Sequence, residues 1–494
     1  MERGLAWIAA AFAAALLVVA PAAAAPIAPG PVSTLPAFTG APFSAQPATP
    51  TLAPQNPFLG KNPNNNIHDD TWMTDAYQRR GPLGRSLVAF SGAFPPSLCG
   101  TLAFDSHGRI VSVCPSAGLP PQARVIDPTT LRPLATLDLP NPPDTTGTPA
   151  YQNFTGGGYF FLDPQDRIWA ATKSNQLWVI AERAGGTRLV KQRAYDLSRV
   201  LTPQEHITSA LPDFSGRIWF VSKQDGKVGL LDPKTGSVRV RTVGEEVENS
   251  FAVDRDAVYI VSDKRMYRFS AGRDGRPRVD WRVTYPNSGI RKPSQVDAGS
   301  GTTPTVMSGG YVAITDNADP MDVVVYRTPK RLRRGQHRVV CTVPVFDKGA
   351  SATENSVITA GRSLIVENNY GYQDPFGPNA GAITQPGFAR VDVNRRGTSC
   401  RLVWTTRTER APTVVPKLST KTGLIYTYTQ DADATPARRW SWTAISFRTG
   451  RRAWKQLAGT GAFYNNNYAG IAIGPTGTAY LGVIGGIVAL KDGR

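Results

Sequence analysis

A short acidic motif, Glu-Asn-Ser, occurs twice in this sequence, at Glu248-Asn249-Ser250 and at Glu354-Asn355-Ser356. Each copy precedes a short hydrophobic run, so we expect the two copies at equivalent places in a repeating structure. Carboxylate and amide oxygens suit a hard cation such as Ca²⁺, and crowded carboxyl groups have raised pKa values that suit acid or base catalysis. We therefore predict a calcium site made of Glu248, Asn249, Glu354 and Asn355, with both glutamates also catalytic.

Other polar residues lie in similar turns. The further predicted catalytic residues are Glu367, Asp316 and His206. The predicted ligand-binding residues are Asn249, Asn355, Asn317, Asp319, Asn368, Asn369, Tyr370, Asn465, Asn466 and Asn467. Amides beside tyrosines suit sugar hydroxyls, so the expected ligand is small and polar or a carbohydrate. The alternative is that these side chains only satisfy loop backbone, and that His206 is a hydrogen-bonded structural histidine.

The elements that must position these residues are short β-strands. Runs rich in Val, Ile, Tyr, Phe and Trp alternate with turns rich in Gly, Asp and Asn, and one phrase of strands recurs along the chain. Its copies begin at residues 100, 159, 212, 250, 303, 356, 413 and 470. We predict an all-β fold, a single β-propeller of eight four-stranded blades. Seven or nine blades, or two separate β-sandwiches, are the alternatives.

The last copy ends too close to the C-terminus to include an outer strand. Residues 86–94 (SLVAFSGAF) are expected to supply that strand, which closes the ring and leaves no open sheet edge. In such a ring, the loops that enter the inner strands and the loops between the two middle strands open on the same face. The predicted site residues should therefore surround the central channel.

Before residue 67 the chain has no strand pattern. Residues 1–25 are predicted to be a secretory signal peptide, with an uncleaved membrane anchor as the alternative. Residues 26–66 are Pro-rich and are expected to be a flexible linker, residues 67–98 a lead-in segment with the closing strand, and residues 99–494 the propeller. The segment Asn64–Trp72, which contains His68, either folds over a face and joins the site or packs as an ordinary lead-in. We expect a secreted or cell-envelope protein.

Four cysteines in an exported chain favour disulfides. Cys99 and Cys114 flank a hairpin, and Cys341 then pairs with Cys400 by elimination. No Cys-x-x-Cys-His occurs, so no covalently attached haem is expected.

Residues 444–454 (AISFRTGRRAW) resemble the tryptophan-docking motif of the quinoprotein alcohol dehydrogenase-like propellers, Ala-x-Asp-x-x-Thr-Gly-x-x-x-Trp, with Ser446 in place of the aspartate. A partial copy lies at residues 230–240 (LLDPKTGSVRV). The resemblance implies a propeller in which Trp454 packs between blades, and pyrroloquinoline quinone as a cofactor. The family's quinone sites typically include a disulfide between adjacent cysteines, which this sequence lacks, and this argues against the quinone. Residues 249–254 (NSFAVD) are more loosely similar to calcium-dependent sugar-lactonase propellers, which usually have six blades.

The net charge is +18. Arg-rich segments fall in the loops between third and outer strands, so we expect a basic face that attracts an anionic envelope polymer, unless these loops are simply solvated. No nucleic-acid recognition motif occurs, and a monomer is expected. We predict an extracytoplasmic enzyme, either a quinoprotein-like oxidoreductase or a metal-dependent hydrolase or lactonase, that acts on a small polar or sugar-like substrate. The alternative is a non-catalytic envelope propeller that binds a glycan or protein.

Overall fold

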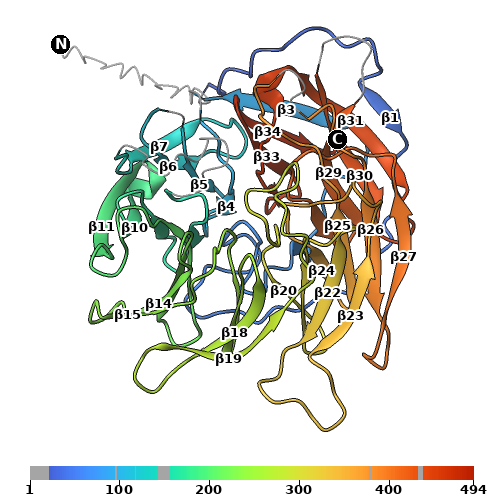
Figure 1. Ribbon diagram of the computed structural model, residues 1–494. Coiled ribbons are helices and arrows are strands. Elements are labelled where there is room, and N and C mark those ends of the chain that lie inside the picture. Colours follow the sequence, from blue (N-terminus) through green and yellow to red (C-terminus); the bar gives the residue numbers. More distant parts are fainter. Residues whose placement is uncertain are drawn as a thin grey trace, which may run out of the picture.

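The computed structural model describes residues 22–94, 97–116, 118–142, 156–377, 381–431 and 438–493. In these residues the strands form eight sheets arranged around one axis, which confirms the predicted eight-bladed propeller (Figure 1). The predicted signal peptide lies almost entirely outside the described residues. Among the described residues, no helix is both long and apolar enough to cross a membrane.

The four strands of each blade are antiparallel, and successive strands lie farther from the central axis. Blade 1 contains β4 (Ala103–Phe104), β5 (Ile110–Cys114), β6 (Gln122–Ile126) and β7 (Pro133–Asp138). Blade 2 contains β8 (Phe161–Leu162), β9 (Ile168–Ala171), β10 (Gln176–Arg183) and β11 (Arg188–Asp196), with the 3-10 turn η2 (Ala184–Gly186). Blade 3 contains β12 (Ile207–Pro212), β13 (Ile218–Ser222), β14 (Lys227–Leu231) and β15 (Val238–Thr242). Blade 4 contains β16 (Ala252–Asp254), β17 (Ala257–Val261), β18 (Arg265–Ala271) and β19 (Pro277–Thr284).

The remaining blades follow the same order. Blade 5 contains β20 (Thr305–Met307), β21 (Tyr311–Thr315), β22 (Asp322–Arg327) and β23 (Val339–Pro344). Blade 6 contains β24 (Ile358–Ala360), β25 (Ser363–Glu367), β26 (Phe388–Val393) and β27 (Cys400–Thr406). Blade 7 contains β28 (Lys417–Ser419), β29 (Leu424–Asp431), β30 (Arg439–Ser446) and β31 (Arg452–Thr460). Blade 8 contains β32 (Ile471–Ile473), β33 (Ala479–Val483) and β34 (Gly486–Lys491), preceded by the 3-10 turn η3 (Ala462–Tyr464).

The ring closes between the two ends of the chain. The N-terminal strand β3 (Val88–Ala93) pairs with β34 as the outer strand of blade 8, from Val88 opposite Lys491 to Ala93 opposite Gly486. The prediction for residues 86–94 is confirmed. Next to this strand, the carboxylate of Asp492 accepts backbone N–H groups of Leu83 and Gly84 at 2.8 and 3.0 Å, which fixes the C-terminal end to the N-terminal segment.

Both predicted disulfides are present. Cys99 pairs with Cys114, and Cys341 pairs with Cys400. The second disulfide joins the outer strands of blades 5 and 6. In the docking-motif segment, Trp454 is fully buried and its ring centroid lies 6.2 Å from that of Tyr426 in the same blade.

A repeated aspartate stabilises the turn between the first and second strands of blades 1 to 3. In blade 3, the Asp213 carboxylate accepts the backbone N–H of Ser215 at 2.8 Å, the Arg217 Nε at 3.0 Å and the indole N–H of Trp219 at 3.1 Å. Asp105 and Asp163 make the same contacts with the residues two and four positions later. A carboxylate with several charge-assisted hydrogen bonds fixes the turn, and through it the second strand.

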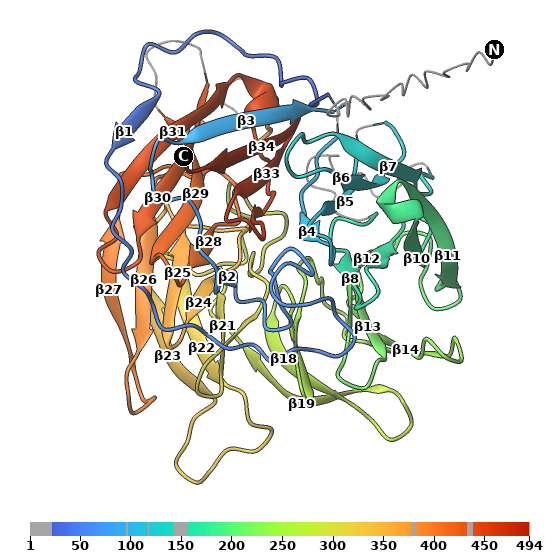
Figure 2. The ribbon, with the colours of Figure 1, turned by 180° about the vertical axis from the view of Figure 1, so that it is seen from behind.

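Residues 56–66 are not the flexible linker that we expected for residues 26–66, and they continue without a break into residues 67–77 of the expected lead-in segment. They run across the centre of the ring, where Figure 2 shows the segment in blue. We call residues 56–77 the plug. Its carbonyl groups accept backbone N–H groups from inner-strand residues of six blades, namely Phe104, Leu162, Val253, Val306, Thr359 and Leu418. It ends in β2 (Ala76–Tyr77), which pairs with β28 in parallel.

The rest of the expected linker also lies on the blades. The strand β1 (Phe38–Gly40) extends blade 7 at its outer edge, and the side chains of Thr51 and Thr359 are hydrogen-bonded at 3.1 Å. The physical reason for the correction is that these Pro- and Asn-rich residues need no core of their own. Their polar groups are satisfied by the inner strands and by the exposed edge of a blade.

Candidate functional site

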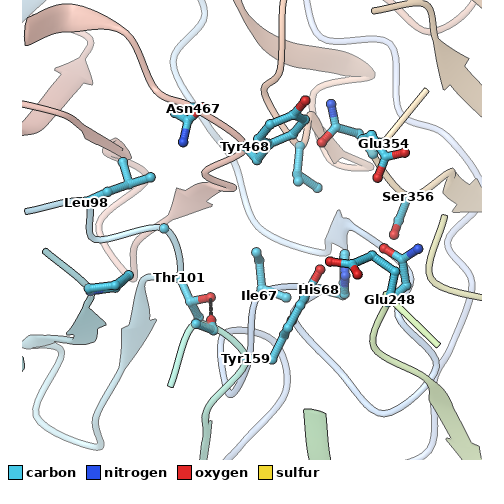
Figure 3. A pocket seen from close by; sticks show the side chains of 16 residues that line it. Ile67, His68, Leu98, Thr101, Tyr159, Glu248, Glu354, Ser356, Asn467 and Tyr468 are labelled. Atoms are coloured by element: carbon cyan, nitrogen blue, oxygen red, sulfur yellow. Dashed lines mark hydrogen bonds between the residues drawn. The ribbon is translucent and has the colours of Figure 1, made fainter. Parts of the chain in front are cut away.

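A cavity of about 50 Å³ lies on the axis, between the plug and the loops that enter the inner strands (Figure 3). The volume corresponds to a few water molecules. Its walls come from the plug and from blades 1, 2, 4, 6, 7 and 8. The polar residues among them are His68, Thr101, Tyr159, Glu248, Asn249, Glu354, Asn355, Ser356, Asn467 and Tyr468.

The two glutamates of the repeated motif face this common cavity. Glu248 lies in the loop before β16 of blade 4, and Glu354 lies in the loop before β24 of blade 6. The two glutamates are therefore two blades apart, as expected. Glu248 Oε2 lies 2.5 Å from the Lys223 ammonium, but burial outweighs this contact and raises the pKa of Glu248 to about 7. Burial, followed by the nearby charges of Asp297 and Glu248, raises the pKa of Glu354 well above its usual value.

The third carboxyl group of this cluster, Asp297, was not predicted. It lies in a long insertion between β19 and β20, residues 285–304, that contacts residues lining the cavity. Tyr468 donates its hydroxyl to Ser294 O at 2.7 Å, and Asn249 donates its amide to Ser300 O at 3.1 Å, so the insertion is fixed to two blades. Burial and the charges of Glu248 and Glu246 raise the pKa of Asp297 well above its usual value.

Of the three carboxyl groups of this cluster, only Glu248 is in contact with the Lys223 ammonium. Like charges in a poorly solvated site cannot all ionise without a large cost in free energy. At neutral pH, at least one of Glu248, Asp297 and Glu354 should carry a proton and be able to donate it.

The plug contributes a histidine that is held by an aspartate. His68 Nδ1 lies 3.0 and 3.1 Å from the two carboxylate oxygens of Asp75. Both residues are buried, and His68 Nε2 has no hydrogen-bond partner among the described residues. His68 is also one of the residues that line the cavity. An anionic partner at Nδ1 favours the tautomer in which Nε2 accepts a proton.

The buried ammonium group of Lys417 contacts Asp75, the aspartate that holds His68. Lys417 Nζ lies 2.5 Å from Asp75 Oδ1 and 3.2 Å from Asp69 Oδ2, and all three side chains are almost completely inaccessible. Burial works to lower the pKa of Lys417, but the charges of Asp69 and Asp75 outweigh it and the pKa is raised. Burial raises the pKa of Asp69 to about 6.

Tyr159 completes one side of the cavity. Figure 3 shows the side chains of Tyr159, His68 and Glu248 directed toward one another, with Glu354 and Tyr468 on another side. Burial raises the pKa of Tyr159, and the charges of Glu248, Glu354 and Asp75 raise it further. Its phenol therefore stays protonated and can donate a hydrogen bond.

The other predicted site residues lie in several places. Asn249, Asn355 and Asn467 line the cavity, whereas Glu367 does not line it and accepts the amide of Asn355. The remaining residues do not line it and have the following contacts. Asp316 accepts backbone N–H groups of Ala318 and Asp322, Asn317 bonds to Asn287 and Ile290 O, and Asp319 accepts the N–H of Gly349.

The predicted residues Asn368, Asn369, Tyr370, Asn465, Asn466 and His206 also do not line the cavity. Asn368 bonds to the backbone of residues 350, 352 and 370, and Asn369 accepts the N–H of Glu354, while Tyr370 donates its own N–H to Asn368. Asn465 bonds to Tyr372, and Asn466 donates to Ala469 O. His206 is buried, and its carbonyl accepts the N–H of Lys223.

The cavity does not fit the two expected cofactors. Glu248 is already paired with Lys223, the Asn355 amide is turned toward Glu367, and the described residues contain no group of three His, Cys, Asp or Glu that could hold a metal. A cavity of about 50 Å³ is also too small for a tricyclic quinone. The chemistry available in the cavity is therefore that of the chain's own side chains.

No family model matches the sequence. A relative from Archaeoglobus fulgidus, an uncharacterised protein, is 26% identical over 367 residues, which are 68% of this chain and 70% of that protein.

Solved propellers align over most of the chain at low identity. A quinohemoprotein alcohol dehydrogenase from Pseudomonas putida has a TM-score of 0.54 and 10% identity over 87% of this chain and 80% of its own. A europium-containing methanol dehydrogenase has a TM-score of 0.51 and 12% identity, over 86% of this chain and 90% of its own. The looser likeness to sugar lactonases is not shown by these comparisons. The chain thus shares the propeller fold of the quinoprotein dehydrogenases, as the docking motif led us to expect.

Proposed function

We propose that the chain is an extracytoplasmic enzyme that hydrolyses a small polar ester or lactone in the central cavity. The observation that carries the proposal is the pair His68 and Asp75: His68 lines the cavity, and its Nε2 has no hydrogen-bond partner among the described residues. The two disulfides support an oxidising compartment. The size of the cavity favours a substrate of a few heavy atoms.

In the proposed reaction, His68 Nε2 takes a proton from a water molecule as the oxygen of that water bonds to the acyl carbon. Asp75 orients the imidazole and stabilises the imidazolium that forms. The bond from the acyl carbon to the leaving oxygen breaks, and a protonated carboxyl group of the Glu248–Asp297–Glu354 cluster donates its proton to that oxygen. The Tyr159 hydroxyl is placed to donate a hydrogen bond to the developing oxyanion.

The test is turnover of a panel of small lactones and acetate esters by the purified protein and two histidine variants. In His68→Gln, activity should fall at least about 100-fold, because general-base catalysis contributes roughly 10²–10⁴-fold. In His107→Gln, which changes an exposed histidine, activity should stay unchanged. Thermal unfolding of both variants verifies that they are folded.

The pH profile gives a second readout. If Glu248 donates the proton, activity should fall as the pH rises through about 7, where this group loses its proton. No turnover of any compound by folded wild-type protein would contradict the proposal, as would equal rates for wild type and His68→Gln. The absence of turnover would favour the alternative, a non-catalytic propeller that binds a glycan or protein, whereas equal rates would mean that His68 is not the base.

A further inference from the structure

The loops between the third and outer strands of blades 5, 6 and 7 form an arginine-rich surface. We call it the arginine rim, and it consists of Arg331, Arg333, Arg334, Arg395, Arg396, Arg448 and Arg451. All seven side chains are exposed, and none makes an ion pair with another described residue. No Asp or Glu lies between residues 328 and 338, 394 and 399, or 447 and 451.

The three loops are neighbours in space. The Cys341–Cys400 disulfide joins blades 5 and 6, and Arg327 Nη2 donates to Gly397 O at 2.6 Å. Between blades 6 and 7, the indole N–H of Trp404 donates to Phe447 O at 3.1 Å. Since turns between third and outer strands lie at the opposite ends of the blades from the loops that line the cavity, the arginine rim belongs to the other face of the disc.

A cleft of about 710 Å³ opens among these loops, and Arg362, Arg390 and Arg395 line it together with the hydroxyl residues Thr49, Ser308 and Ser363. Two of its guanidinium groups are held in place. Arg362 Nη1 donates to the carbonyls of Asn394 and Arg395 at 2.8 and 2.7 Å, and Arg390 is paired with Asp392 at 2.8 Å. Three guanidinium groups against one carboxylate leave the cleft positively charged.

We propose that the cleft and the arginine rim together bind a linear anionic polysaccharide that carries sulfate or phosphate groups. Guanidinium groups donate two parallel hydrogen bonds to such oxyanions, and preorganised ones lose little entropy when they bind. A row of unpaired arginines across three blades matches a chain of repeated charges better than a single small anion. This site is separate from the central cavity and does not depend on the proposed hydrolysis.

The surface composition favours a soluble polymer over a lipid bilayer. None of the large exposed apolar side chains among the described residues lies in the three loops of the arginine rim. A surface that inserts into a bilayer interface carries apolar side chains beside its basic residues, and the arginine rim does not.

The test compares dextran sulfate with neutral dextran of the same length, with binding measured at 50 and 200 mM NaCl. Wild-type protein should bind dextran sulfate only, with an affinity that falls roughly tenfold or more at the higher salt concentration. The double variant Arg395→Gln/Arg396→Gln should bind about tenfold more weakly than wild type, because two contacts to the polymer are lost.

The matched control is Arg239→Gln/Arg241→Gln, which removes the same charge from exposed positions on β15 in blade 3. It should bind like the wild type. Equal weakening in the two double variants would overturn the proposal, because only net charge would then matter. Binding to phosphatidylglycerol vesicles without binding to dextran sulfate would also overturn it and would indicate a membrane surface.

Discussion

Replacing Lys417 with methionine should show how strongly the plug depends on its buried charges. Lys417 is fully buried and contacts the carboxylates of Asp69 and Asp75 at 3.2 and 2.5 Å. Methionine fills a similar volume but leaves both carboxylates without their ammonium partner. Removal of one member of a buried ion pair usually costs about 3–5 kcal/mol in the free energy of unfolding, since the other charge stays buried.

The cost should depend on pH. The pKa of Asp69 is already raised to about 6 by burial, and the loss of the neighbouring ammonium raises it further. At pH 8 the variant should therefore carry the full penalty of about 3–5 kcal/mol. At pH 5 the penalty should be smaller, because a protonated Asp69 needs no partner charge.

Urea unfolding of wild type, Lys417→Met and the double variant Lys417→Met/Asp69→Asn at pH 5 and pH 8 measures these differences. Lys421→Met is the control, because Lys421 is exposed and forms no ion pair with another residue that the structure describes. A Lys417→Met variant within about 1 kcal/mol of wild type at pH 8, well below the usual cost, would refute the reasoning. A penalty that is the same at both pH values would refute it as well.

Two further predictions concern a turn and the carboxyl cluster. Asp213→Ala should lower the free energy of unfolding by roughly 2–3 kcal/mol in urea titrations, because the Trp219 and Arg217 donors lose their shared acceptor; a loss under about 0.5 kcal/mol would contradict the role of this turn. Since the folded state keeps a proton on Glu248 up to about pH 7 while the unfolded state loses it near 4.5, wild type should lose roughly 3 kcal/mol of stability as the pH rises across that range. Glu248→Gln should reduce this loss, and an unchanged pH dependence in the variant would contradict the raised pKa.

Much of the fold could be predicted from the sequence because each blade repeats a local pattern. The strand phrases, their turns and the closing strand at residues 86–94 depend on residues close in sequence. The convergence of Glu248 and Glu354 also followed from the repeat, because both precede an inner strand of an equivalent blade. The two disulfides were predicted because the chain is expected to be exported, and because Cys341 and Cys400 remain once Cys99 is paired with Cys114.

The parts that could not be predicted are those without a repeat. The plug has no alternating apolar pattern, so its place was set by hydrogen bonds to blades far away in the sequence, such as those to Val253 and Thr359. The segment around His68 was noted, but His206 was preferred because it lies inside a repeat. Asp297 lies in an insertion that the other blades lack. Lys417 lies in the inner strand β28, and its side chain contacts plug residues that are more than 300 positions away in the sequence.

The proposed site exists only if the plug lies inside the ring and carries His68 to the cavity. Hydrogen–deuterium exchange of peptides from residues 60–78, followed by mass spectrometry, tests this directly. The structure predicts that these amides exchange about as slowly as those of the inner strands. Complete exchange within seconds, as in a flexible linker, would contradict the placement of His68 and with it the proposed chemistry.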